Sequence, residues 1–256
     1  MPVRKRACRG RRRIATKWLA GLLIANASCF PARAGDLVDL QLVIAADVST
    51  SMDAQEKALQ QQGFAKAFRR PEIIEAITGG RNGRIAVTYV EWGGDGQRRV
   101  VVPWTIIANE ADAWLFSLKL EANSPAKIRQ GTSISGILSY ADYLIRFSGF
   151  DATRSLINIS GDGVNNKGLE VEPVRAGVLA NGITINALPI VYDAMQGGEE
   201  EAIAPEDLIA YFRREVIGGP GAFAEAVAAP EQYSAAIYRK LLREISNSSE
   251  VAAAAD

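Results

Sequence analysis

The stretch VDLQLVIAADVSTS, residues 38–51, decides the fold expected for this chain of 256 residues. Its apolar residues fall on both faces of the two-residue repeat, which is typical of a strand covered on both sides within a parallel sheet. The motif Asp47-x-Ser49-x-Ser51 then lies at the carboxyl end of this strand. Open α/β sheets bind their ligands at that edge. Residues 47–51 are therefore a candidate ligand site.

Segments typical of strands and helices alternate through the rest of the chain. Gly93-Gly94-Asp95-Gly96 separates two β-branched runs and predicts a hairpin, hence one antiparallel edge strand. Pro71 predicts a break or restart after the first helix. The expected class is α/β, a doubly wound, mostly parallel central sheet with one antiparallel edge strand and helices on both faces. The further predicted strands are 84–92, 98–106, 155–159 and 183–191, with a short one near 222–227, and the predicted helices are 53–70, 109–121, 132–147, 170–180, 204–216 and 230–246.

The net charge of zero conceals two different parts. Residues 1–34 contain nine basic and no acidic residues, so residues 35–256 contain 20 basic and 29 acidic ones. The first part has the order of an export signal: basic residues, an apolar run over 18–30, and Ala32-x-Ala34 as a cleavage site. The apolar run is shorter than the roughly 20 residues of a membrane span. A membrane anchor and a basic nucleic-acid-binding arm are the alternatives.

The expected organisation is an export signal over 1–34, one domain over 35–246 and a flexible tail over 247–256. The protein is then periplasmic or secreted, with no stable membrane span after cleavage. Amino-terminal sequencing of the exported protein should give Gly35 as the first residue, because only there do Ala-x-Ala and the end of the apolar run coincide. An exported protein that still begins at Met1 would contradict this prediction.

The composition excludes several kinds of site. The chain has no histidine, which excludes a Ser-His-Asp triad, a Cys-His dyad and His-ligated zinc or iron. Its two cysteines, Cys8 and Cys29, both lie in the export signal, so disulfides are not expected in the mature chain. The acidic balance of residues 35–256 argues against nucleic acid as a partner. Carboxylates and hydroxyls remain as the candidate chemistry.

Two further loops are candidates to bring oxygen ligands to Asp47-x-Ser49-x-Ser51. Gln130-Gly131-Thr132 precedes the predicted central helix, and Ser160-Gly161-Asp162-Gly163 follows the fourth predicted strand. Carboxylates together with hydroxyls suit a hard cation such as Mg²⁺. The alternative is local: Ser51 or Asp53 caps the following helix, and the remaining side chains make turn hydrogen bonds. The first motif taken alone leaves both interpretations open.

Taken together, the three motifs resemble the metal-ion-dependent adhesion site (MIDAS) of von Willebrand factor A domains. They are Asp47-x-Ser49-x-Ser51 after the first strand, Gly131-Thr132 before a central helix, and Asp162-Gly163 after the fourth strand. The resemblance extends over residues 37–246, and the nearest branch is a bacterial group of secreted A-like domains without assigned function. It implies that the metal ligands are the hydroxyls of Ser49, Ser51 and Thr132, with Asp47 and Asp162 bound directly or through water.

The resemblance also implies a function. The cation, Mg²⁺ or another divalent ion such as Mn²⁺ or Ca²⁺, would accept as its remaining ligand a carboxylate from a protein partner with an exposed Asp or Glu. We therefore expect a binding module and no enzyme. A metal-assisted hydrolase using the same site, and a structural module whose metal only stabilises loops, are the alternatives.

One departure from the family pattern affects the site. Ser160-Gly161 stands before Asp162 where many members have an apolar residue and a threonine, so the reach of Asp162 is open. Nearby, Asn165 and Asn166 are candidate auxiliary oxygen donors, although loop asparagines usually serve turns.

Overall fold

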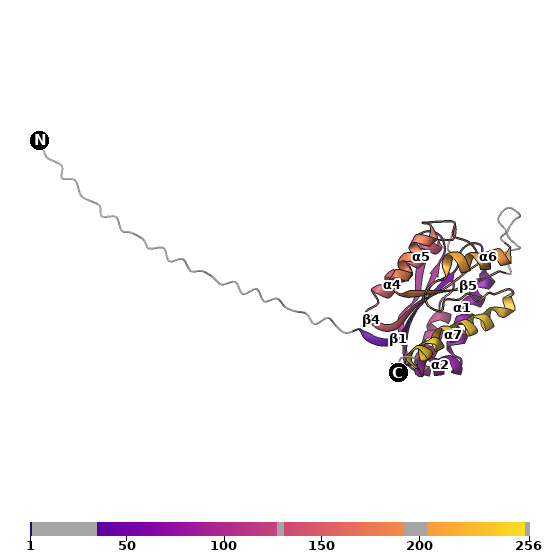
Figure 1. Ribbon diagram of the computed structural model, residues 1–256, viewed down its shortest axis with the longest axis horizontal. Coiled ribbons are helices and arrows are strands. Elements are labelled where there is room, and N and C mark those ends of the chain that lie inside the picture. Colours follow the sequence, from indigo (N-terminus) through magenta and orange to yellow (C-terminus); the bar gives the residue numbers. More distant parts are fainter. Residues whose placement is uncertain (2–34, 127–130, 192–203, 254–256) are drawn as a thin grey trace. The chain divides into compact units, whose positions relative to one another are not determined.

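A computed structural model describes residues 1, 35–126, 131–191 and 204–253 of the chain (Figure 1). Its centre is a five-stranded sheet in the order β3-β2-β1-β4-β5. All neighbouring strands are parallel except β3, which runs antiparallel to β2 at one edge. The predicted doubly wound α/β class with one antiparallel edge strand is therefore confirmed. The strands are β1 (Asp36–Asp47), β2 (Ile85–Trp92), β3 (Arg98–Ile107), β4 (Phe150–Gly161) and β5 (Ile183–Pro189).

Helices cover both faces of the sheet, α1, α2, α3 and α7 on one and α4, α5 and α6 on the other (Figure 1). The alternation of β1 explains the two layers: Leu42 and Ile44 pack into the first helical layer, and Val43 and Ala45 into the second. The helices are α1 (Ala54–Phe68), α2 (Pro71–Thr78), α3 (Glu110–Glu121), α4 (Ile134–Arg146), α5 (Val171–Ala180), α6 (Pro205–Tyr211) with a π turn η2 (Phe212–Val216), and α7 (Tyr233–Ala253) after the 3-10 turn η3 (Pro230–Gln232).

Several predicted boundaries differ from the structure. The predicted break at Pro71 is present, because a new helix, α2, begins at this residue. The expected strand near 222–227 is wrong: Ala224 makes only an isolated bridge to Ala187 of β5, and Val227 makes only one to Ile190 just beyond β5. Gly219 and Gly221, both with positive φ, and Pro220, which has no N–H, precede this segment and prevent a regular ladder. The last helix continues to Ala253 instead of ending near 246.

The structure bears on only one of the two expectations about export and the membrane. The predicted export signal lies outside the described residues. Within the part of the chain that is described, no helix is long and apolar enough to cross a membrane.

A buried polar network fixes α7 to the sheet. Lys240 and Glu244 are each 1% exposed and form an ion pair one helical turn apart. The Glu244 carboxylate also accepts hydrogen bonds from the side-chain amides of Asn158 on β4, at 2.8 Å, and Asn186 on β5, at 3.1 Å. Burial lowers the pKa of Lys240, and the negative charge of Glu244 counteracts that shift. The Glu244 carboxylate is thus paired with three buried donors, and its burial depends on them.

The topology places a crevice at the carboxyl ends of β1 and β4. From β1 the chain passes through α1 and α2 to β2 on one side, whereas from β4 it passes through α5 to β5 on the other side. Loops that leave neighbouring parallel strands in opposite directions open a ligand-binding crevice between them. The register pairs Ala46 with Ser160, so Asp47 and Gly161 lie side by side at this point.

Candidate metal-binding site

Four of the five predicted ligands form a continuous chain of hydrogen bonds across the crevice. The Ser49 backbone N–H donates to Asp47 Oδ1 at 2.7 Å, and the Ser49 and Ser51 hydroxyl oxygens lie 2.9 Å apart. The Ser51 hydroxyl donates to Asp162 Oδ1 at 2.8 Å. Asp162 therefore reaches the first motif despite the unusual Ser160-Gly161 before it.

The alternative interpretation, in which the first motif only caps the following helix and serves the turn, applies to Asp53 but not to Ser51. The helix cap is Asp53, whose side chain accepts from the Glu56 N–H while the Glu56 carboxylate accepts from the Asp53 N–H. Ser51 takes no part in this capping box. Because α1 is capped without Ser51, the Ser51 hydroxyl is directed to the crevice and Asp162 instead.

The surroundings of Asp47 strongly perturb its carboxylate. The residue is fully buried, and its Oδ2 atom has no hydrogen-bond partner among the described residues. Burial raises the pKa of Asp47 well above its usual value, the neighbouring Asp162 raises it further, and the Ser49 hydrogen bonds partly counteract this. A Cβ atom added at Gly161 would lie 3.1 Å from Asp47 Oδ2, so the glycine leaves space beside this oxygen.

These features fit a hard cation. An ionised carboxylate is costly to bury, and a positive ion beside the unpartnered oxygen would offset the cost. The described residues contain no cluster of three or more His, Cys, Asp or Glu side chains that could hold a metal. The predicted set instead combines two carboxylates with three neutral hydroxyls, all oxygen donors of the kind that Mg²⁺ prefers.

Thr132 arrives at the same place from the loop before α4. Its side chain is buried, and a Cβ atom at Gly163 would lie 3.6 Å from its hydroxyl oxygen. Its N–H donates to the Asn166 side chain at 2.8 Å, and its carbonyl accepts from the Asn166 N–H at 2.9 Å. The structure thus places Thr132 against the loop that carries Asp162.

Asn165 and Asn166 join the loop after β4 to the start of α4. The Asn165 side-chain oxygen accepts from the Ser135 N–H at 3.1 Å, and its amide donates to the Leu169 carbonyl at 3.0 Å. Gly131, with φ of 83°, permits the close approach, because a Cβ atom there would lie 2.4 Å from the Lys167 side chain. Asn166 holds Thr132 in position and Asn165 holds the first turn of α4, in agreement with the expectation that these asparagines serve the turn.

Gln60 supports the site from below, a role that the sequence did not indicate. Its side-chain amide donates to the Asp47 carbonyl at 2.9 Å, and its side-chain oxygen accepts from the Ser160 hydroxyl. All three residues are fully buried. Ser160 therefore points into the core beneath the site, and its bond to Gln60 ties the ends of β1 and β4 to α1.

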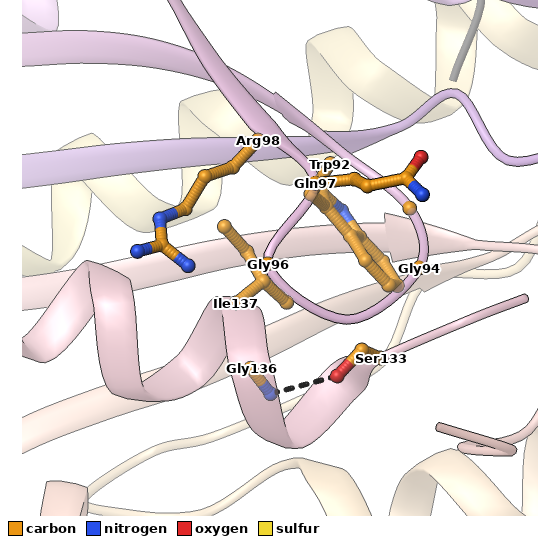
Figure 2. A pocket seen from close by; sticks show the side chains of 9 residues that line it. Trp92, Gly94, Gly96, Gln97, Arg98, Ser133, Gly136 and Ile137 are labelled. Carbon is orange, nitrogen blue, oxygen red and sulfur yellow. Dashed lines mark hydrogen bonds between the residues drawn. The ribbon is translucent and has the colours of Figure 1, made fainter. Parts of the chain in front are cut away.

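The β2–β3 hairpin contacts the segment that precedes α4. The Ser133 N–H donates to the Gly93 carbonyl at 2.9 Å, and the Ser133 hydroxyl caps α4 by accepting from the Gly136 N–H at 3.3 Å (Figure 2). Glu91 at the end of β2 accepts from the Ala126 N–H at 2.9 Å and pairs with Arg99. Burial raises the pKa of Glu91, which these two partners counteract.

Comparison with known proteins agrees with the fold. No curated protein sequence matches the chain. The pilus adhesin SpaC from Lactobacillus rhamnosus GG superposes with a TM-score of 0.58 at 12% identity, covering 84% of this chain and 32% of SpaC. Proximal thread matrix protein 1 (PTMP1) from the mussel byssus, in a structure with a zinc-occupied MIDAS motif, gives 0.55 at 14% identity, with 81% and 46% covered.

A von Willebrand factor type A protein from Catenulispora acidiphila gives a TM-score of 0.52 at 16% identity, covering 82% of this chain and 43% of that protein. The chain thus spans 32–46% of the length of these proteins, and the likeness shows a von Willebrand factor A-like fold. The family model described as "Protein of unknown function (DUF1194)" matches residues 37–249, more than four fifths of the chain. The protein therefore belongs to the DUF1194 family.

Proposed function

We propose that this protein is an exported binding module that engages a protein partner by coordinating a partner carboxylate at a Mg²⁺-dependent site. The observation that carries the proposal is the buried, unpartnered Oδ2 of Asp47 at the end of the hydrogen-bonded chain to Asp162. When bound, the cation supplies an electrophilic centre with an exchangeable position. The residues that would hold it are Asp47, Ser49, Ser51, Thr132 and Asp162.

The residue types explain why such a site would accept a carboxylate. Two of the five side chains carry a formal negative charge, and the three hydroxyls are neutral. The negative charge of the ligands therefore does not exceed the positive charge of a divalent ion. Ser51 is exposed and Asp162 is half-buried, whereas Asp47 and Ser49 are buried. The site is therefore closed on the side of Asp47 and open to an incoming ligand on the side of Ser51.

The comparisons support binding as the kind of function. SpaC is a pilus adhesin, and PTMP1 is a thread matrix protein with a structure whose MIDAS motif holds zinc. Mn²⁺ or Ca²⁺ could replace Mg²⁺ at a site of oxygen donors. The partner is a protein with an exposed Asp or Glu, not a nucleic acid, and it is met in the periplasm or outside the cell. We propose no enzymatic activity.

The test is capture of partners from the exported fraction on the immobilised protein, with Mg²⁺ and with chelator, followed by titration of the captured partner. The proposal requires binding that chelator removes and that Asp47→Ala also removes. Turnover of generic esters in the presence of Mg²⁺ would favour a hydrolase. Stabilisation by Mg²⁺ with a partner affinity that chelator leaves unchanged would favour a structural metal.

Replacing Thr132 with Ala should weaken partner binding more than stability. The cap of α4 is Ser133, so the variant loses a buried hydroxyl and no cap, at a cost of about 1 kcal/mol in unfolding free energy. Binding should fall by a larger factor because one cation ligand is lost. Thr50→Ala is the matched control, since Thr50 is exposed in the same region and is not a predicted ligand. Equal affinities of folded Thr132→Ala and Thr50→Ala proteins at saturating Mg²⁺ would contradict the proposed role.

A further inference from the structure

A cleft of about 290 Å³ lies along α4, the helix that starts directly after Thr132 and Ser133. It is lined by one cationic side chain, two tyrosines and two small residues of α4. A second, smaller pocket shares two of these lining residues and extends to Ser133 (Figure 2). The cleft is thus continuous with the helix turn that adjoins the candidate site. Its lining residues are Arg98, Gly136, Ser139, Tyr140 and Tyr143.

Arg98 supplies the positive charge and the N–H donors of the cleft. Its guanidinium lies 4.3 Å from the centroid of the Tyr140 ring, and Figure 2 shows the side chain extending from β3 toward the first turns of α4. Stacking on an aromatic face leaves the N–H groups at the edge of the guanidinium free to donate. The Tyr140 and Tyr143 rings are stacked with centroids 6.3 Å apart, and each carries a phenol O–H donor at the cleft.

Arg98 also differs from the neighbouring arginines. Arg99 pairs with Glu91, and Arg146 on α4 pairs with Asp142. In contrast, no carboxylate of the described segments lies within 4.0 Å of the Arg98 guanidinium. Residues 35–256 contain nine more acidic than basic residues. A cation that the described segments leave without a carboxylate partner, in a cleft of an acidic domain, is suited to a carboxylate from another molecule.

We propose that this cleft binds a second acidic side chain of the same partner, so that the partner presents two carboxylates, one to the metal site and one to Arg98. This inference rests on the proposed function of the metal site. From Ser133 to Tyr140, α4 advances about 10 Å at roughly 1.5 Å per residue. An extended peptide covers about 10 Å in three residues at roughly 3.3 Å each. The partner motif is therefore an extended segment with acidic residues about three positions apart.

Synthetic Gly/Ser peptides carrying two glutamates, separated by one to six positions, provide the probe. Each peptide is titrated against the full chain with NMR or calorimetric detection, in Mg²⁺ and in chelator, beside a peptide with one glutamate. We expect the two-glutamate peptide at a separation near three to bind about tenfold more tightly than the one-glutamate peptide, as for one added charge-assisted contact. Arg98→Gln should reduce the affinity of that peptide to the level of the one-glutamate peptide and leave the latter unchanged.

The control is Arg146→Gln, which removes an exposed arginine of α4 that already has a partner. It should change neither affinity, and circular dichroism should show both variants folded. If every two-glutamate peptide bound like the single one, or if Arg98→Gln had no effect, the second contact would be disproved while Mg²⁺-dependent binding of one glutamate still supported the proposed function. If tight binding depended on Arg98 but was indifferent to chelator and to Asp47→Ala, the metal-bridged function would fail and the cleft alone would bind the acid.

Discussion

Asp47→Asn should abolish the stabilisation of the protein by Mg²⁺ and, in the same experiment, stabilise the metal-free protein. In the native chain the Asp47 carboxylate is fully buried beside Asp162 with one oxygen unpartnered in the described structure. Asparagine has nearly the same shape, can still accept from the Ser49 N–H, and carries no charge. We expect a gain of about 1–2 kcal/mol in unfolding free energy without metal, because a buried uncompensated charge is removed.

The effect with metal has the opposite sign. A cation that binds only the folded state at 100 times its dissociation constant adds about 2.7 kcal/mol, roughly 5–10 °C in melting temperature for a domain of this size. Melting curves in Mg²⁺ and in chelator should show this increment for the native chain and none for Asp47→Asn. Retention of the increment would show that the cation binds elsewhere.

Asp53→Asn is the matched control. Asp53 lies six residues from Asp47 and caps α1, and asparagine caps helices about as well as aspartate. The control should keep the native melting temperature and the full Mg²⁺ increment. A loss of stability of metal-free Asp47→Asn would mean that the Asp47 charge is favourably compensated, contrary to its raised pKa.

The largest expected loss of stability comes from Lys240→Met, far from the candidate site. Methionine fills a similar volume, but it leaves the Glu244 carboxylate buried without its cation. We expect a loss of about 3–5 kcal/mol in unfolding free energy, the usual cost of breaking a buried ion pair from one side. Urea unfolding monitored by circular dichroism measures it.

The double variant Lys240→Met/Glu244→Gln separates charge from packing. A glutamine at 244 can still accept from one asparagine, and its amide can donate to Asn158 Oδ1, which has no partner among the described residues. The double variant should therefore regain most of the unfolding free energy that Lys240→Met loses. The surface control Arg239→Gln, which breaks the exposed pair with Glu225, should cost less than about 1 kcal/mol. A double variant no more stable than Lys240→Met would show that packing around Lys240, and not the unpaired charge, determines the loss.

The elements and loops of the site were predictable because each depends on a local pattern. The two-sided apolar run of β1, the glycines of the hairpin and the amphipathic face of α4 are all legible in consecutive residues. The convergence of Asp47, Ser51 and Asp162 was expected only from the resemblance, which implies that the three motifs share one site. Gln60 could not be found in this way, since its partner Ser160 lies 100 residues away in the chain.

The burial of Lys240 could not be predicted from the sequence either. Lysine and glutamate four residues apart usually form a pair on a solvent-exposed helix face. In α7 the same spacing is buried, because Asn158 and Asn186 of the sheet supply complementary donors. Only the tertiary pairing of α7 with β4 and β5 distinguishes the two cases.

The two edges of the sheet bear on how this domain meets other proteins. On the β5 side, residues 218–227 make two isolated bridges to the outer strand and a third to Ile190 just beyond it. On the β3 side, the strand begins with Arg98 and Arg99, carries Pro103 without an N–H, and has register shifts against β2. Charged residues, proline and bulges at an edge oppose the addition of a foreign strand. Both edges therefore disfavour strand addition by further copies of the domain, and we expect the partner of the proposed function to bind at the loops that follow the carboxyl ends of the strands.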